Sequence, residues 1–313
     1  MPDRTIAPIL ILGFNRPDRI KNLIESIRKF KPPTIFLALD GPRKNNENDF
    51  VKNAECRKLV SSIDWTNEVQ TLFRDENLGL QNAVPQAVSW VLSQQQEVIV
   101  LEDDVVVTGE FLSFATDRLT KYKNHSEIMH ISGYNVVPRE HLSLSSSSER
   151  LSKVPESIAW ATWDRAWKLY DPSLNWSRNA AIKDIERHTF GKLSALRWKQ
   201  MLGDASSGRI STWAYRWVES IWANEGLCLS PNVNLVTYNG YTDGTNTLRR
   251  ARWPELPIGE LTTDCGEPTF DLKADQWIHK VVFRGDIAGV LTGPFESLAL
   301  EIRNRYRKRE KSK

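Results

Sequence analysis

The first 110 residues alternate short apolar runs with helix-like segments, and this alternation limits the folds open to the chain. Four runs of strand character predict strands at residues 7–14, 33–42, 68–73 and 97–107. Segments with helical character lie between them, at residues 17–30, 54–63 and 81–94. In the first of these, Ile20, Leu23 and Ile27 share one helical face. Repeated strand–helix units predict an α/β fold with a mostly parallel central sheet and helices on both faces.

Composition narrows the class of protein further. The 313 residues suffice for one large domain, and a net charge of +3 gives no support for nucleic acid as a partner. Cys56, Cys228 and Cys265 are widely spaced, which argues against a disulfide framework and fits a reducing compartment. No apolar run is long enough for a membrane span or a signal peptide. We therefore expect a soluble, cytoplasmic protein.

Polar residues follow each predicted strand of the first third. They are Asn15 and Arg16 after the first strand, Asp40 after the second, Arg74 to Gly79 after the third and Glu102 to Asp104 in the fourth. Ligands of parallel sheets bind beyond the carboxyl ends of the strands. The shared placement of these residues predicts a ligand site at this edge of the sheet.

The three acids in the stretch "VIVLEDDVVV" interrupt an otherwise apolar run. Buried carboxylates are costly unless they are paired or bind a metal. Acids at the end of a central strand suit Mn²⁺ or Mg²⁺, which take few protein carboxylates and complete their shell with phosphates and water. The alternative is a solvated acidic turn. Asp40, followed by Gly41 and Pro42, likewise admits a plain turn role.

Several ordered motifs resemble GT-A glycosyltransferases. "ILGFNRPDRIKNLIESI", "LALDGPR", "RDENLGLQNAVPQAVSWVL" and "VIVLEDDVVVTGEFLSFA" are similar to the nucleotide-sugar half of that family. They look closest to bacterial sugar transferases related to the inverting N-acetylglucosaminyltransferases. "AWATWDRAWKLYD" and "STWAYRWVESIWANEGLCLSPNVNLVTYNGYTDGTNT" are similar to the acceptor side, so the resemblance covers roughly residues 5 to 250. It implies a Rossmann-like nucleotide-diphospho-sugar transferase fold.

The resemblance implies a role for each matching residue of the donor site. Asn15, Arg16 and Asp40 would hold the nucleotide, Asp40 through the uracil ring of a UDP-sugar. Arg74 and the turn from Asn77 to Gly79 would line the sugar-nucleotide pocket. The acidic residues divide their roles: Glu102 and Asp103 would lie against the ribose and the donor sugar, and Asp104 would ligate the metal.

The catalytic base departs from the family pattern. Ser211, Ala214 and Asn246 stand where relatives carry acids or a histidine, and none of them is a carboxylate. An inverting transfer needs a base to deprotonate the acceptor hydroxyl. The candidate residues in the second half are Glu219, Asp204, Asp164 and Asp243. Glu219 lies two turns beyond Ser211 on the helix expected there, which would place the two residues on one face.

Eight of the twelve tryptophans lie between residues 160 and 222. Spacings of three and four at Trp160, Trp163 and Trp167, and at Trp213 and Trp217, predict shared helical faces. Core packing is one interpretation. The other is stacking on sugar rings, for which Trp160 and Trp213 are the acceptor-side candidates. Asp243 is a further acceptor-side candidate.

We expect one domain made of a nucleotide-sugar half (residues 1–142), an acceptor-side half (143–295) and a basic tail (296–313). The serine-rich stretch at residues 142–153 predicts a loop. The tail is either solvated or contacts the anionic inner face of the cell membrane, where a lipid-linked or other glycan acceptor would lie.

Three functions remain open from the sequence. The first is a metal-dependent hexosyl- or N-acetylhexosaminyltransferase of bacterial surface polysaccharide synthesis. The second is a sugar nucleotidyltransferase. The motif "GFNRPDR" argues against it, because it contains a single glycine where a glycine-rich phosphate loop would be expected. The third is a degenerate transferase retained for glycan binding or assembly.

Overall fold

The computed structural model describes residues 5–143, 147–240, 256–261 and 266–311, with side chains up to residue 304. Asp243, Asn246 and Cys265 lie outside the described residues. An eight-stranded sheet in the order β3-β2-β1-β4-β8-β6-β9-β7 forms the centre of the molecule. A second sheet pairs β10 with β5.

The first half builds the parallel part of the sheet. Its elements are β1 (Ile9–Gly13), α1 (Pro17–Arg28), β2 (Thr34–Leu39), α2 (Glu47–Lys58), η1 (Leu59–Ser62), β3 (Glu68–Phe73), α3 (Leu80–Leu92), β4 (Glu97–Glu102), β5 (Val105–Val107), α4 (Gly109–Lys121), β6 (Ile128–Ser132) and η2 (Arg139–His141). β1 pairs in parallel with β2 and with β4, and β2 pairs in parallel with β3. The four strands thus end at one edge, as the strand–helix alternation predicts.

The second half completes the same sheet. Its elements are β7 (Glu149–Ser152), β8 (Trp160–Trp163), α5 (Asp164–Trp167), α6 (Asn175–Asn179), α7 (Ile182–Thr189), α8 (Lys192–Ser206), α9 (Ala214–Ala223), β9 (Leu227–Pro231), β10 (Val236–Tyr238), α11 (Leu272–Trp277), η3 (Ile278–Val282) and α12 (Ile287–Lys311). β8 runs antiparallel to β4 and β6, β9 runs parallel to β6, and β7 runs antiparallel to β9. The sheet is therefore mostly parallel, with β7 and β8 reversed.

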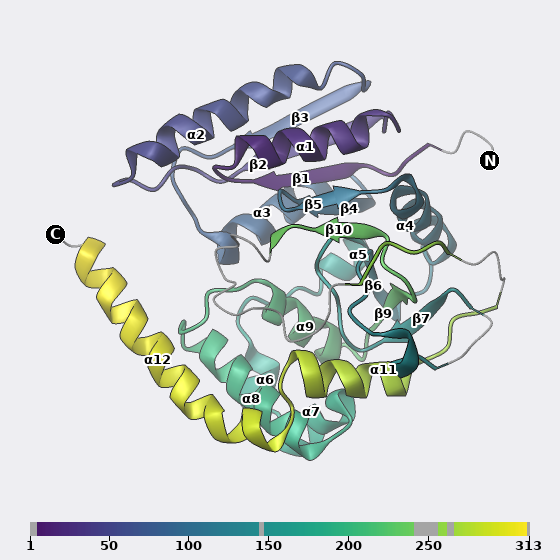
Figure 1. The fold of residues 1–313 in the computed structure, drawn as a ribbon, viewed down its shortest axis with the longest axis vertical. Helices are drawn as coiled ribbons and strands as arrows, with labels where there is room; N and C mark the ends of the chain where they lie inside the picture. Colours follow the sequence, from purple (N-terminus) through teal and green to yellow (C-terminus); the bar gives the residue numbers. More distant parts are fainter. Residues whose placement is uncertain (1–4, 144–146, 241–255, 262–265, 312–313) are drawn as a thin grey trace.

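Helices cover both faces of the sheet, which confirms the predicted α/β class (Figure 1). Ile9 and Ile11 of β1 face a core that contains residues of α1 and α4, whereas Leu10 and Leu12 face a core that contains residues of α3, α8 and α9. Burial of both faces explains why β1 reads as a continuous apolar run rather than as alternating residues.

Three sequence predictions about local structure are wrong. Trp160 and Trp163 lie in strand β8, not on a helix, and their spacing of three puts them on opposite sides of the strand. The predicted serine-rich loop contains strand β7, which pairs with β9 at the edge of the sheet. The predicted fourth strand is two strands, because β4 ends at Glu102 and β5 pairs with β10 instead.

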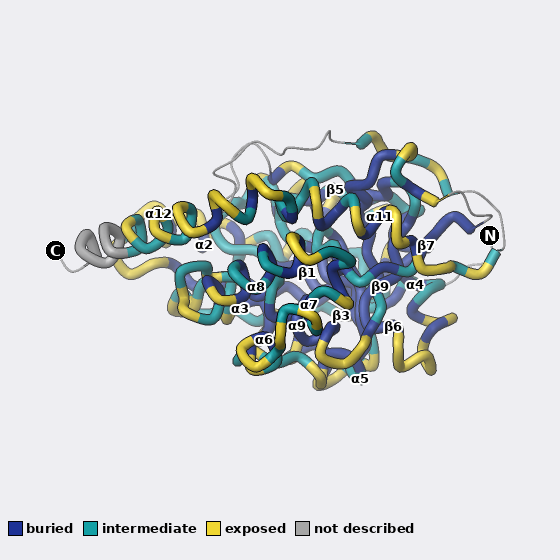
Figure 2. Tube along the Cα trace, turned by 90° about the horizontal axis from the view of Figure 1, so that it is seen from below, coloured by how far each residue is buried: buried dark blue, intermediate teal, exposed yellow. Residues whose placement is uncertain are grey.

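The tube coloured by burial shows dark strands inside and exposed helix faces outside (Figure 2). Residues 296–311, predicted as a tail, continue the helix α12, which begins at Ile287. Among the helices that the structure describes, none combines the length and the apolar character that crossing a membrane requires.

Candidate functional site

The acids that interrupt the apolar run form the turn between β4 and β5. Glu102 is the last residue of β4, and Asp103 and Asp104 make the turn. The chain then enters β5, where Val105 pairs with Tyr238 of β10. One residue further on, the Asn239 N–H donates to the Asp104 carbonyl at 2.8 Å. The acidic turn is thus held between the first half and the segment that follows β10.

Arginine side chains approach the carboxylates of this turn. Arg16, which follows β1, donates to Asp103 at 3.1 Å. Burial, followed by repulsion from Asp104, raises the pKa of Glu102 to about 8. Burial also raises the pKa of Asp103 to about 6, against the favourable charge of Arg16. A positive ligand would stabilise the ionised forms of Glu102 and Asp103.

Trp213 joins this turn from the second half of the chain. Its side chain donates a hydrogen bond to Glu102, and this bond favours the ionised carboxylate. The Trp213 ring stacks on Trp160 with centroids 5.2 Å apart, and both rings are almost fully buried. Of the two interpretations of these tryptophans, core packing is the one that their burial supports.

The acidic turn fits a divalent cation in charge and in ligand type. Its carboxylate oxygens are the ligands that Mn²⁺ and Mg²⁺ prefer. Among the described residues no group of three or more His, Cys, Asp or Glu side chains is arranged to enclose a metal. A cation here would take few protein ligands and the remainder from substrate phosphates and water.

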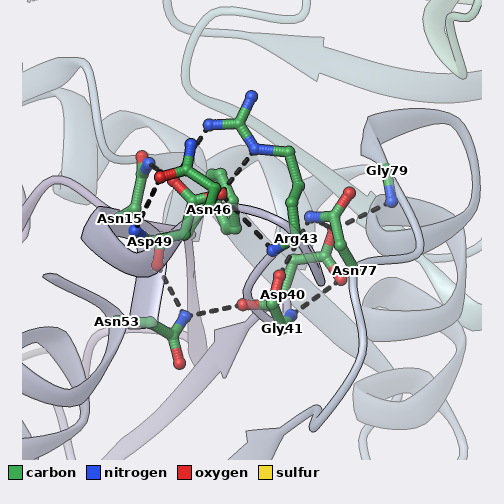
Figure 3. Close-up of polar contacts among 10 residues, drawn as sticks. Asn15, Asp40, Gly41, Arg43, Asn46, Asp49, Asn53, Asn77 and Gly79 are labelled. Atoms are coloured by element: carbon green, nitrogen blue, oxygen red, sulfur yellow. Dashed lines mark hydrogen bonds and ion pairs between the residues drawn. The ribbon is translucent and has the colours of Figure 1, made fainter. Parts of the chain in front are cut away.

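A second polar cluster surrounds Asp40 at the end of β2 (Figure 3). One carboxylate oxygen accepts from the N–H groups of Gly41 (3.0 Å) and Leu78 (2.9 Å). The other accepts from the Asn77 side chain (3.0 Å) and the Gly79 N–H (2.9 Å). A carboxylate offers about four acceptor sites, so these four bonds leave none for the predicted contact with a uracil ring.

The turn that Asp40 holds depends on two glycines. Gly79 has a φ of +73°, a backbone conformation that side chains other than glycine rarely adopt. A Cβ on Gly41 would collide with the backbone of Glu76. The carboxyl end of β2 and the loop after β3 therefore form one close-packed unit.

A third cluster was not predicted from the sequence. Asp49 is almost fully buried and accepts from Arg43 Nε at 2.5 Å and Nη2 at 2.9 Å. Asn15 also donates to Asp49, at 2.7 Å. The paired arginine lowers the pKa of Asp49 against the opposing effect of burial. Asn15, which was predicted to bind a nucleotide, thus forms a hydrogen bond with α2. The only sequence signal for this cluster is that Asp49 has a basic residue, Arg43, six positions before it.

The helix α2 ties three strand ends together. Asn53 donates to the carbonyls of Phe14 and Asp40, both at 2.8 Å. Arg57 donates to Asn53 at 2.9 Å and to the Arg74 carbonyl at 2.5 Å. The segments after β1, β2 and β3 are therefore fixed relative to one another, and the predicted convergence of their polar residues is observed.

Three of the four candidate bases lie in parts of the chain that the structure describes, and two of them, Asp204 and Glu219, are buried. Asp164 N–H bonds to the Gln96 carbonyl at 2.9 Å, beside the start of β4, whereas Glu102 is at its end, about 17 Å along the strand. Asp204 pairs with Arg209 at 2.6 Å. Glu219 is almost fully buried, and neither of its carboxylate oxygens has a hydrogen-bond partner among the described residues. Burial raises the pKa of Glu219.

The reason for choosing Glu219 also fails. It rested on a helix shared with Ser211, but α9 begins at Ala214, so the helical face was not shared.

Comparison with known proteins gives only distant likenesses. No family model matches the chain, and no curated protein matches it. The mannosyltransferase PcManGT from Pyrobaculum calidifontis, solved with GDP-Man and Mn²⁺, is 11% identical with a TM-score of 0.37 over 71% of this chain and 75% of that one. HddC from Yersinia pseudotuberculosis is 14% identical with a TM-score of 0.31 over 50% of this chain and 77% of that one. At these scores the likeness assigns no function, which we therefore derive from the site.

Proposed function

We propose that the chain is a metal-assisted glycosyltransferase that moves a sugar from a nucleotide diphosphate, preferentially a UDP-sugar, to a hydroxyl acceptor with inversion. The observation that carries this proposal is the acidic turn after β4, where Arg16 and Trp213 converge on carboxylates of raised pKa. The resemblance of the strand-end motifs to GT-A transferases supports it. Bacterial surface glycan synthesis is the process in which we place the reaction.

The chain's own residues would bind and orient the donor. Arg16 would hold the diphosphate, and the turn from Asn77 to Gly79, positioned by Asp40, would line the nucleotide pocket with Arg74. Glu102 and Asp103 would lie against the ribose and donor sugar, while Asp104 would hold the cation. A bound Mn²⁺ or Mg²⁺ would act as a Lewis acid that stabilises the departing nucleotide diphosphate.

A base for the acceptor hydroxyl is still required. Asp164 lies at the start of β4, far from the acidic turn, Asp204 pairs with Arg209, and Glu219 is almost fully buried, so none of them is proposed for this role. Asp243 is the remaining candidate from the sequence. The lack of a carboxylate at Ser211 and Ala214 favours a second candidate function, a nucleotide-sugar-binding protein without turnover.

Calorimetric titration tests the donor site. We expect UDP and UDP-sugars to bind in the presence of Mn²⁺ and to bind at least about tenfold more weakly without it. Asp104→Asn should abolish the metal dependence. The control Asp64→Asn, at an exposed aspartate that pairs with Arg28, should bind as the natural chain does. No nucleotide binding under any condition would refute the donor site.

Turnover separates the two candidate functions. A transferase releases UDP from the donor when an acceptor is supplied, and slowly with water in its place. Binding of UDP-sugar with no UDP release across an acceptor screen would favour the binding protein.

A further inference from the structure

The long helix α12 exposes its apolar side chains. Five large hydrophobic residues are spaced by four, four, three and four positions, so they form one stripe along the helix. Their exposed fractions are 65% for Ile287, 66% for Leu291, 74% for Phe295, 55% for Leu298 and 47% for Ile302. Figures 1 and 2 show α12 as an outer element that runs from the body of the protein to the C-terminus.

The polar side of α12 faces the protein instead. Ser297 donates to Asp204 at 2.6 Å and accepts from Gln200 at 3.1 Å. Glu296 pairs with Arg197 at 2.6 Å. Further along, Asn304 donates to the Arg209 carbonyl at 3.0 Å.

This arrangement is the reverse of the usual surface helix, whose apolar stripe faces the core. The hydrogen bonds and the ion pair on the inner side fix the rotation of α12 about its axis. The apolar stripe therefore faces outward. A contiguous exposed apolar stripe on a protein marks a surface that binds another protein or a membrane.

The charge of the helix end indicates which of these partners binds. Residues 303–313 contain seven lysines or arginines and one glutamate, a net charge of +6, and α12 is helical to Lys311. Pairing with α12 of a second copy would set these basic ends against each other or against the apolar stripe, without an acidic partner. An anionic lipid surface complements both the apolar stripe and the basic end.

We propose that α12 lies in the plane of an anionic membrane surface, with Ile287, Leu291, Phe295, Leu298 and Ile302 buried among the lipids. The helix is bonded to Asp204 and Arg209. These residues lie shortly before Trp213 in the chain, and Trp213 donates a hydrogen bond to Glu102 of the acidic turn. Membrane attachment would therefore hold the candidate site near acceptors embedded in the bilayer. The attachment itself does not depend on the proposed transferase activity.

Vesicle co-sedimentation of the full chain tests this surface without any nucleotide. We expect binding to phosphatidylcholine vesicles that contain about 30% phosphatidylglycerol, and at least about tenfold weaker binding to pure phosphatidylcholine. Raising the salt from about 0.1 M to about 0.5 M should weaken binding. Phe295→Ser/Leu298→Ser should reduce binding by about tenfold or more.

A matched control uses the same residue types elsewhere. Phe50→Ser/Leu169→Ser removes an exposed phenylalanine and an exposed leucine from outside α12 and should leave vesicle binding unchanged. Unfolding curves establish that both double variants are folded. Absence of binding to anionic vesicles, or binding that survives Phe295→Ser/Leu298→Ser, would overturn the proposal. A dimer in sedimentation velocity that this variant dissociates, without vesicle binding, would assign the stripe to a second copy instead.

Discussion

At the scale of single residues, the site edge is built by polar side chains that each hold several backbone segments. Asp40 bonds to its own turn and to the loop after β3, and Asn53 bonds to the ends of β1 and β2. Such residues fix the positions of the neighbouring candidate site residues. Substitution of these residues should therefore lower the free energy of unfolding.

Asp40→Ala removes the acceptor for four hydrogen bonds, three of them from backbone N–H groups. We expect the free energy of unfolding to fall by about 2–4 kcal/mol, because partly buried donors lose their partners. Urea unfolding measures this change. Asp75→Ala, at a side chain that is 96% exposed in the same loop, should change it by less than about 0.5 kcal/mol. Equal effects of the two substitutions would show that the Asp40 bonds do not stabilise the turn.

Sequence patterns allowed a turn role for Asp40 as an alternative to nucleotide binding and placed Gly79 in a turn, but they did not predict the cluster around Asp49. A turn is encoded within a few neighbouring residues, and the positive φ of Gly79 requires glycine locally. The bond from Asn15 to Asp49 joins positions 34 apart and depends on how α2 packs beside β1. No local pattern carries that information.

At the scale of elements, periodicity predicted strands β1 to β4 and helices α1 and α3, and it failed for the tryptophans. It also placed the second helix at residues 54–63, whereas α2 is Glu47–Lys58 and a 3-10 turn follows it. A spacing of three at Trp160 and Trp163 fits a helix face, but strand pairing with β4 and β6 decides the structure. Tertiary packing thus overrides the local pattern. The acidic turn was anticipated, whereas the pairing of β5 with β10 depends on a segment about 130 residues away.

Helices of the second half also bury neutral histidines against tryptophans. Trp198 Nε1 donates to His279 Nδ1 at 3.0 Å, and His279 Nε2 lies 3.1 Å from the His188 carbonyl. Burial lowers the pKa of His279 to about 3. Because the unfolded chain binds a proton near pH 6.5 and the folded chain does not, this group makes unfolding easier as the pH falls below 6.5.

His279→Gln should remove that contribution. Between pH 6.5 and pH 5, we expect the free energy of unfolding of the variant to fall by about 2 kcal/mol less than that of the natural chain. Chemical denaturation at a series of pH values measures the difference, in which the other titrating groups cancel. Parallel profiles for His279→Gln and the natural chain would contradict a neutral His279.

At the scale of the whole molecule, the two halves of the sequence share one sheet. β8 of the second half lies between β4 and β6, and the acidic turn of the first half bonds to Trp213 of the second. The sequence predicted a single domain with two functional halves, but it could not show that the sheet crosses between them. Strand order depends on contacts between distant segments, which periodicity does not record.

Continuity of the sheet predicts that the halves unfold together. Leu37→Ala, in the buried strand β2, should lower the free energy of unfolding by about 2–5 kcal/mol. Tryptophan fluorescence reports mainly on the second half, which holds eight of the twelve tryptophans between residues 160 and 222. If the sheet couples the halves, the fluorescence midpoint should shift as far as the far-ultraviolet circular dichroism midpoint. Val51→Ala, at an exposed residue of α2, should shift neither. A fluorescence midpoint that Leu37→Ala leaves unchanged would mean that the second half folds independently. The candidate site would then lie between two separately stable units.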